Sequence, residues 1–204
     1  MSTFTLAERT REPAHNRPAA TPIGPSFDGV LVAAQAGAEW AWTLLYRAVA
    51  APVRGYLIAN GAEDPDNLLG ELFLQLARNL PSFSGDEHAF RSWVFMVAHH
   101  RLVDERRRRR RRPAEPVGEL PDRAGGEDPA TAVLDAEALA ALNRLTREQR
   151  EVIALRVFGD LALEEVSRIV GRPVTAVKAL QRRGLAALRK EFSDRAYPPE
   201  RPRR

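Results

Sequence analysis

Apolar positions recur at the three- and four-residue spacing of helices along most of the chain, and no segment alternates as a β-strand does. The pattern predicts helix over residues 30–58, with a break near Pro52. A second helix is predicted at residues 66–80, where five apolar side chains form one stripe. A third, long helix starts near residue 88 and continues into a run of seven arginines at residues 106–112.

Four shorter helices are predicted in the second half, at about residues 132–144, 146–158, 163–170 and 174–191. Residues 146–149 read Thr-Arg-Glu-Gln, a capping box that marks the start of a helix. Gly171, which tolerates left-handed backbone, and Pro173 form a three-residue turn between the last two helices. Two helices joined by a turn of this length are typical of a helix-turn-helix.

The two helical halves are separated by residues 113–132, which contain four prolines, three glycines and five acidic residues. Such a composition buries too little apolar surface to fold, so this segment is predicted to be a flexible linker. Residues 1–27 carry four prolines and no apolar periodicity, which indicates a disordered tail. The predicted fold is all-α, with small domains at 28–112 and 133–195 and a second tail at 196–204.

Charge alternates along the chain more strongly than the net charge of +4 indicates. Residues 28–77 carry six acidic residues against two arginines, whereas residues 78–112 carry ten arginines against four acidic residues. The linker is again acidic, and residues 139–195 carry twelve basic residues against seven acidic ones. Two basic segments on either side of an acidic spacer favour two separate contacts with nucleic acid.

The rest of the composition excludes several classes of protein and several kinds of binding site. The chain has no cysteine, which excludes disulfides and thiolate zinc sites and leads us to expect a cytoplasmic protein. No run of about eighteen apolar residues predicts a membrane span, and the first residues lack the apolar core of a secretory signal. We find no phosphate-binding glycine loop, catalytic triad order or metal-ligand spacing, so neither an enzyme nor a cofactor is expected.

The last predicted helix has two distinct faces when its residues are placed at 100° intervals. Val177, Leu180, Gly184 and Leu188 share one face, which suits packing against a neighbouring helix. The opposite face carries small and basic residues, which can enter the major groove and reach phosphates or guanine edges. An ordinary helical hairpin with a solvated basic face remains the alternative.

Residues 145–190 (LTREQREVIALRVFGDLALEEVSRIVGRPVTAVKALQRRGLAALRK) resemble region 4 of RNA polymerase sigma factors, most closely the extracytoplasmic-function (ECF) type. A departure is Ala162, where the family often has a serine cap. A LuxR-like output domain has a similar pattern and remains a rival, although the first half shows no βα alternation for a receiver domain. The resemblance implies recognition of the −35 promoter element by Arg172, Thr175, Lys178, Ala179, Arg182 and Arg183.

Residues 66–112 (DNLLGELFLQLARNLPSFSGDEHAFRSWVFMVAHHRLVDERRRRRRR) resemble region 2 of the same family. The implied partners are core RNA polymerase, through its clamp helices and flap, promoter DNA and an anti-sigma factor, with no membrane insertion. The implied polymerase-binding residues are Asp66, Asn67, Leu68, Glu71, Leu72 and Phe73. The implied residues for the −10 element are Phe83, His100, Arg101, Arg106, Arg107, Arg108 and Arg109.

Four aromatic and imidazole side chains in this half have separate expectations. Trp93 lies in a run of six apolar residues and is expected in the core. For Phe83, stacking on an unpaired base and anchoring its own loop both remain open. We expect His100 near DNA and His99 exposed to solvent. The seven arginines would repel one another unless phosphates met them, so nucleic acid is their natural counterion.

Overall fold

The computed structural model describes residue 23, residues 26–111 and residues 136–196, with side chains to residue 193. Throughout these ranges the regular elements are helices and none is a strand, which confirms the all-α prediction. The predicted linker at 113–132 and most of both predicted tails lie outside the described residues.

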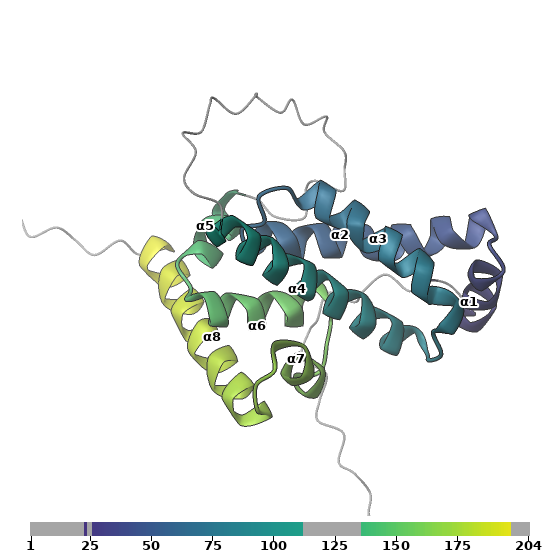
Figure 1. Ribbon diagram of the computed structural model, residues 1–204. Helices are drawn as coiled ribbons and strands as arrows, with labels where there is room; N and C mark the ends of the chain where they lie inside the picture. Colours follow the sequence, from purple (N-terminus) through teal and green to yellow (C-terminus); the bar gives the residue numbers. More distant parts are fainter. Residues whose placement is uncertain (1–22, 24–25, 112–135, 197–204) are drawn as a thin grey trace, which may run out of the picture.

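The first half consists of four α-helices and one short 3₁₀ turn, all within residues 27–111 (Figure 1). Their bounds are α1 Phe27–Gln35, α2 Glu39–Ala59, α3 Pro65–Asn79, the turn Leu80–Ser82 and α4 Glu87–Arg111. Asp64 caps α3 by accepting a hydrogen bond from the Asn67 amide at 3.1 Å. The predicted helix at 66–80 and the long helix that ends in the arginines are therefore confirmed.

The break in the first predicted helix lies at Gly37, and the prediction of a break near Pro52 is wrong. Gly37 has a φ of 85°, a left-handed conformation that glycine adopts without steric cost and that reverses the chain between α1 and α2. Pro52 lies inside α2, which continues because Val49, Val53 and Tyr56 on one of its faces are all fully buried. The free energy gained by burying these side chains offsets the loss of the backbone hydrogen bond that proline cannot donate.

The predicted N-terminal tail extended too far, because its last residues belong to the fold. Ile23 and Phe27 are buried, and the Phe27 ring lies 5.7 Å from that of Phe90. Ser26 caps α1 by accepting a hydrogen bond from the Gly29 amide at 3.3 Å. The apolar side chains at residues 23 and 27 are too few to show periodicity in the sequence, but the aromatic cluster at α4 gives them a site to fill.

The second half contains α5 Ala136–Asn143, α6 Arg147–Phe158, α7 Leu163–Val170 and α8 Val174–Ala196. The capping box is present, with the Gln149 amide donating to Thr146 Oγ1 at 3.3 Å and the Thr146 amide donating to Gln149 Oε1 at 3.1 Å. Gly171 ends α7 with a φ of 64°, as the predicted turn requires. In Figure 1, α7 and α8 form the helix-turn-helix at the edge of the molecule away from α1.

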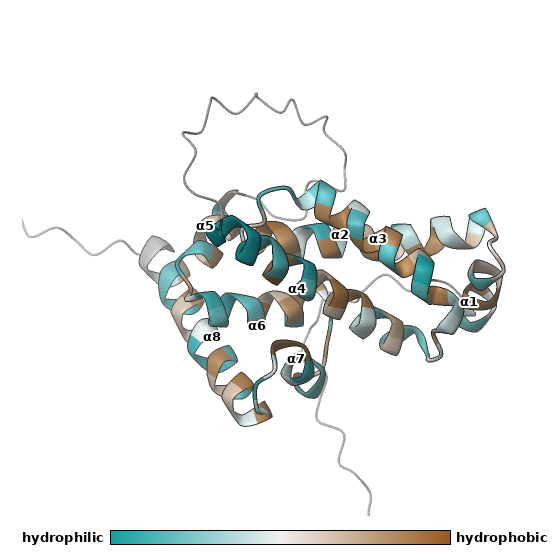
Figure 2. Ribbon diagram, viewed as in Figure 1, coloured by the Kyte–Doolittle hydropathy of each residue, from teal (hydrophilic) through white to brown (hydrophobic). Residues whose placement is uncertain are grey.

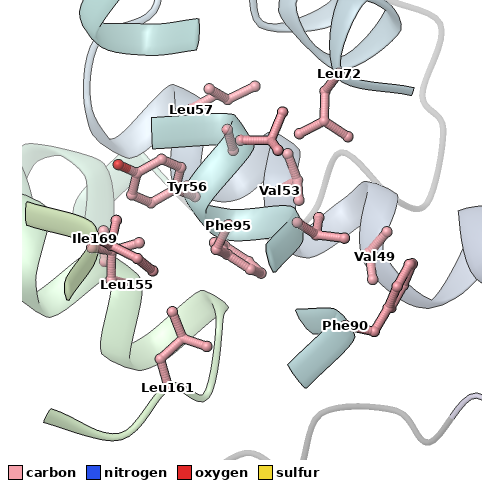
Figure 3. Close-up of a cluster of buried hydrophobic side chains, with 14 of the residues drawn as sticks. Val49, Val53, Tyr56, Leu57, Leu72, Phe90, Phe95, Leu155, Leu161 and Ile169 are labelled. Atoms are coloured by element: carbon pink, nitrogen blue, oxygen red, sulfur yellow. The ribbon is translucent and has the colours of Figure 1, made fainter. Parts of the chain in front are cut away.

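The two halves pack on each other and share one continuous apolar core. Helix α2 packs against α6, and α4 packs against α7. Figure 3 shows Tyr56 and Phe95 of the first half facing Leu155, Leu161 and Ile169 of the second. The predicted domains are therefore in contact in this structure, an arrangement we call the closed form.

Candidate nucleic-acid interface

The packed face of α8 is the one that the sequence predicted. Val177 is fully buried and Leu180 is 9% exposed. Gly184 is also buried, and a Cβ placed there would lie 2.5 Å from Cδ1 of Ile153 on α6. Glycine at this position therefore allows α6 and α8 to approach closely, as we expected from its place on the packed face of the helix.

The opposite face of α8 is open to solvent and carries the residues predicted for the −35 element except Arg172, which lies in the turn before the helix. Arg172, Thr175, Lys178, Arg182 and Arg183 are exposed, and Ala179 is half-buried. A shallow hollow of about 280 Å³ lies along this face, and it is lined by Lys178, Gln181, Arg182, Leu185 and Arg189. Gln181 was missed in the sequence, although glutamine can pair with adenine in the major groove.

Helix α3 presents the candidate polymerase surface. A hollow of about 560 Å³ is lined by Asp66, Asn67, Gly70, Glu71, Phe73 and Leu74. The Phe73 ring packs 4.7 Å from that of Tyr46, and Tyr46 and Leu74 are 48% and 61% exposed. Neither was among the predicted residues, although Leu74 is a leucine outside the apolar stripe and could have been noticed for that reason. Exposed apolar side chains that lie together are a common feature of surfaces that bind partner proteins.

Two of the predicted polymerase contacts are corrected by the structure. Leu68 and Leu72 are 3% and 0% exposed, because they lie on the stripe that packs α3 into the core. A buried leucine cannot touch a partner directly. These two side chains hold α3 in place, and Asp66, Asn67, Glu71 and Phe73 are the predicted residues that reach its surface.

Phe83, predicted near the −10 element, is engaged within its own loop. Its ring stacks on Trp93 with centroids 5.1 Å apart and meets Phe90 edge-on at 5.9 Å. The side chain of Gln35 donates to the Phe83 carbonyl at 2.9 Å. These contacts favour loop anchoring for Phe83, while Trp93 is half-buried against the core as predicted.

The two adjacent histidines have opposite environments, and the prediction that His99 is exposed is wrong. His99 is 8% exposed, and its Nδ1 lies 3.0 Å from the hydroxyl of Tyr56, which is fully buried. Burial lowers the pKa of His99, and the charges of His100, Arg106 and Arg147 lower it further against the opposing effect of Glu151. His100 is exposed to solvent, and its predicted position near DNA stays a prediction.

We expect His99 to make the stability of the protein depend on pH. Because its folded pKa lies below the ordinary value, the unfolded chain binds the proton more tightly. The stabilisation is complete above about pH 6.5 and is lost as the pH falls from there through the folded pKa. Between urea unfolding at pH 7.5 and at pH 5.5, the wild type should lose up to about 1 kcal/mol in total.

In His99→Gln this loss between pH 7.5 and 5.5 should largely disappear. The matched control is His100→Gln, which removes the exposed neighbour and should keep most of the pH dependence, because burial is the largest cause of the lowered pKa of His99. An unchanged pH dependence in His99→Gln would show that the buried imidazole is not its source.

Arg101 and Arg106 are held by the protein itself. Arg101 donates to Gln75 Oε1 at 2.7 and 3.1 Å and ties α4 to α3. Arg106 donates to Glu151 at 2.5 Å and to the Asn60 carbonyl at 2.5 Å, which places it between the two halves. Arg107, Arg108 and Arg109 are exposed, so they are the predicted −10 arginines that are open to solvent in the closed form.

Glu151 is a functional candidate that the sequence analysis missed. It is 8% exposed, and its Oε1 also accepts from Arg147 Nε at 3.0 Å. Burial raises the pKa of Glu151, but the hydrogen bonds from Arg147 and Arg106 outweigh it and hold the pKa below its ordinary value. The carboxylate is therefore ionised at neutral pH and joins α4 to α6.

A second polar contact between the halves involves Glu165 at the start of α7. Its Oε2 lies 2.6 Å from Nε2 of His88 on α4. The same oxygen accepts from the Ala162 amide at 2.8 Å and so supplies the start of α7 with a cap that the alanine side chain cannot provide. This carboxylate links the helix-turn-helix to the first half.

Comparisons with known proteins agree with this division. The family model for sigma-70 region 2 matches residues 42–112, and that for sigma-70 region 4 matches residues 141–190. The ECF RNA polymerase sigma factor ShbA of Streptomyces griseus is 33% identical over 132 residues, which cover 61% of this chain and 69% of ShbA. The chain belongs to the ECF group of the sigma-70 family.

Two further similarities agree with the assignment of this chain to the sigma-70 family. The ECF RNA polymerase sigma factor BldN of Streptomyces coelicolor is 29% identical over 189 residues, which cover 89% of this chain and 72% of BldN. The structure of CnrH in complex with the cytosolic domain of CnrY has a TM-score of 0.58 at 20% identity, covering 82% of this chain and 98% of that chain. The chain thus shares its fold with CnrH.

Neither a membrane-spanning helix nor a metal cluster is found in the described part of this sigma factor. None of its helices there is long and apolar enough to cross a membrane. Within the same residues, no three or more histidine or acidic side chains are grouped as metal ligands.

Proposed function

We propose that this sigma factor binds core RNA polymerase through α3 and directs promoter-specific initiation by using α4 at the −10 element and α8 at the −35 element. It acts by binding alone, in the cytoplasm. The observation that carries the proposal is the pair of surfaces in one chain. Helix α3 offers an acidic and apolar surface for a protein, and α8 offers a basic one for DNA.

The surface of α8 combines residues that position DNA with residues that can read it. Lys178 carries a compact charge on a flexible stem and suits a phosphate. Arg182 has a planar fork that can donate to both O6 and N7 of guanine. Both are exposed whereas Val177 on the opposite face is buried, so the helix can enter a groove without losing its packing.

The surface of α3 has the mixed character of a protein interface. Tyr46, Phe73 and Leu74 supply the apolar centre, and Asp66 and Glu71 supply acidic groups around it. Asp66 is paired with Arg54, whose Nε lies 2.7 Å from Oδ1, but its side chain is still 64% exposed. An aromatic and aliphatic centre with a charged rim is typical of a specific protein contact.

The closed form must open for both promoter elements to be engaged. Elements at −10 and −35 lie about 25 base pairs apart, or about 85 Å along the duplex. A compact chain of about 150 residues has a radius of gyration of about 15 Å. When both elements are bound, the halves must therefore separate. The contacts of Glu151 with Arg106 and of Glu165 with His88 must then break.

Association with core polymerase tests the proposal. We expect a dissociation constant in the nanomolar range, about −12 kcal/mol, and polymerase-dependent transcription from a cognate promoter. Glu71→Lys should weaken the complex at least tenfold, because it reverses a charge beside the Phe73–Leu74 surface. Fluorescence anisotropy with labelled sigma factor measures the affinity.

The matched control for this experiment is Glu39→Lys, which reverses an exposed charge at the start of α2. Its affinity should change less than threefold. Equal losses in the two variants would remove α3 as the docking surface. A sigma factor that elutes separately from core polymerase at micromolar concentrations would overturn the proposed function.

We also propose an anti-sigma protein as a partner. The sigma factor RpoE of Bartonella quintana was solved in complex with the anti-sigma factor NepR and has a TM-score of 0.58 at 20% identity, covering 74% of this chain and 96% of that chain. This likeness concerns the fold, and purification of the tagged protein from its host tests for the partner. A co-purifying protein that prevents core polymerase from binding would support the proposal.

A further inference from the structure

A pocket rich in arginine lies where the end of α4 meets the start of α6. Its volume is about 300 Å³. Figure 2 shows how hydrophilic the last turns of α4 are compared with the middle of the same helix. The side chains that define the pocket are Asn60, Arg106, Arg109, Arg110, Arg147 and Arg150. We call it the arginine pocket.

The carboxylate at this pocket does not balance its charge. Glu151 accepts hydrogen bonds from Arg106 and Arg147, which leaves three further guanidinium groups around the same space. Arg109 and Arg110 form no ion pair with any residue of the described ranges. Five guanidinium groups around so small a space repel one another unless an anion lies between them.

Two buried polar atoms of the lining also lack partners. Nε of Arg150 is a buried donor, and Oδ1 of Asn60 is a buried acceptor, and neither has a hydrogen-bond partner among the residues that the structure describes. A buried polar group without a partner costs free energy, so such groups in native proteins call for an explanation.

The lining also shows the electrostatic effect of this crowding. Burial lowers the pKa of Arg150, and the positive charge of Arg106 lowers it further. Arginine nevertheless stays protonated at neutral pH, so the pocket keeps its charge. Phosphate groups match such a set well, because guanidinium forks donate to their oxygens in pairs.

We propose that the arginine pocket binds a small polyphosphate anion, such as inorganic pyrophosphate or the diphosphate group of a nucleotide. The pocket is of a size for a small molecule and far too narrow to admit a DNA duplex. A diphosphate carries several negative charges within a few ångströms. Guanidinium groups from both halves of the protein can therefore bind the same anion.

Binding in this pocket would favour the closed form. Arg106, Arg109 and Arg110 come from the first half, whereas Arg147 and Arg150 come from the second, so the anion joins the two. A ligand that binds only the closed form lowers the affinity of the protein for any partner that requires the two halves to be apart. This regulatory consequence rests on the proposed function, but the binding of the anion does not.

Titration calorimetry of the full-length protein with inorganic pyrophosphate tests the site. We expect one saturable site with a dissociation constant of about 10 μM at physiological salt. Arg110→Ala should weaken binding at least tenfold. Arg111→Ala is the matched control, since it removes the next exposed arginine of α4, which does not line the pocket, and should change the affinity less than twofold.

Three outcomes would overturn the proposal. Equal losses in Arg110→Ala and Arg111→Ala would mean that the arginines only attract counterions. Absence of saturable binding would exclude the site. Binding that appears only after the acidic residues of 113–132 are neutralised would assign the pocket to the chain's own linker.

A further measurement separates the site from its regulatory consequence. Saturating pyrophosphate should weaken the binding of core polymerase several-fold in the wild type and not in Arg110→Ala. If pyrophosphate binds but leaves this affinity unchanged, the proposed closure is wrong. Failure of the sigma factor to bind core polymerase at all would instead contradict the proposed function and leave the calorimetry unaffected.

Discussion

Glu151→Gln is expected to lower the free energy of unfolding by about 3 kcal/mol at neutral pH. The carboxylate accepts hydrogen bonds from Arg106 at 2.5 Å and from Arg147 at 3.0 Å, and its side chain is 10% exposed. Without it, Arg106 stays between the halves as a nearly buried charge with no carboxylate at Nη1. Removing one partner of a buried ion pair is costly for this reason, because the remaining charge is not solvated. Urea unfolding followed by circular dichroism measures the change.

Glu148→Gln provides the control for this prediction. Glu148 lies three residues earlier on the same helix, its side chain is 45% exposed, and it is 3.8 Å from Arg172. An exposed pair of this kind contributes less than about 1 kcal/mol. Similar losses in the two variants would show that Glu151 acts no differently from a surface carboxylate. The closed form would then depend on its apolar core alone.

Arg182→Ala is expected to weaken binding to a cognate −35 duplex by about 1–3 kcal/mol and to relax the sequence preference there. Its side chain is exposed along the hollow of α8, on the side opposite Val177 and Leu180. Lys178→Ala should instead weaken binding to all sequences alike. It should also reduce the slope of log affinity against log salt concentration by about one. Affinities of both variants for cognate and scrambled duplexes at two salt concentrations distinguish the two roles.

The comparison between duplexes decides what Arg182 does. If Arg182→Ala loses the same affinity on the cognate and the scrambled duplex, Arg182 contacts phosphate and reads no base. Sequence preference would then have to come from other residues of the same face. Gln181 is the first to examine, because it lines the same hollow and can donate to and accept from adenine.

The local elements of this protein could be predicted from its sequence because their signals are local. The capping box at Thr146, the left-handed Gly171 and the apolar stripe of α3 all act within a few residues of chain. The two faces of α8 follow from the helical repeat, which is enough to assign Val177 to the core and Lys178 and Arg182 to the surface. The resemblance to the sigma-70 family rests on these same segments.

What the tertiary structure alone decided concerns side chains whose partners are distant in sequence. His99 is buried because Tyr56 lies 43 residues earlier on α2, and Arg106 pairs with Glu151, 45 residues later. The pairing of the halves likewise turns a run of arginines into a pocket. A helical repeat shows that a residue lies on a face but not what that face meets, because the partner is set by how whole helices pack. The sequence therefore determined the helices and the exposed face of α8, whereas packing decided which charged groups are buried between the two halves.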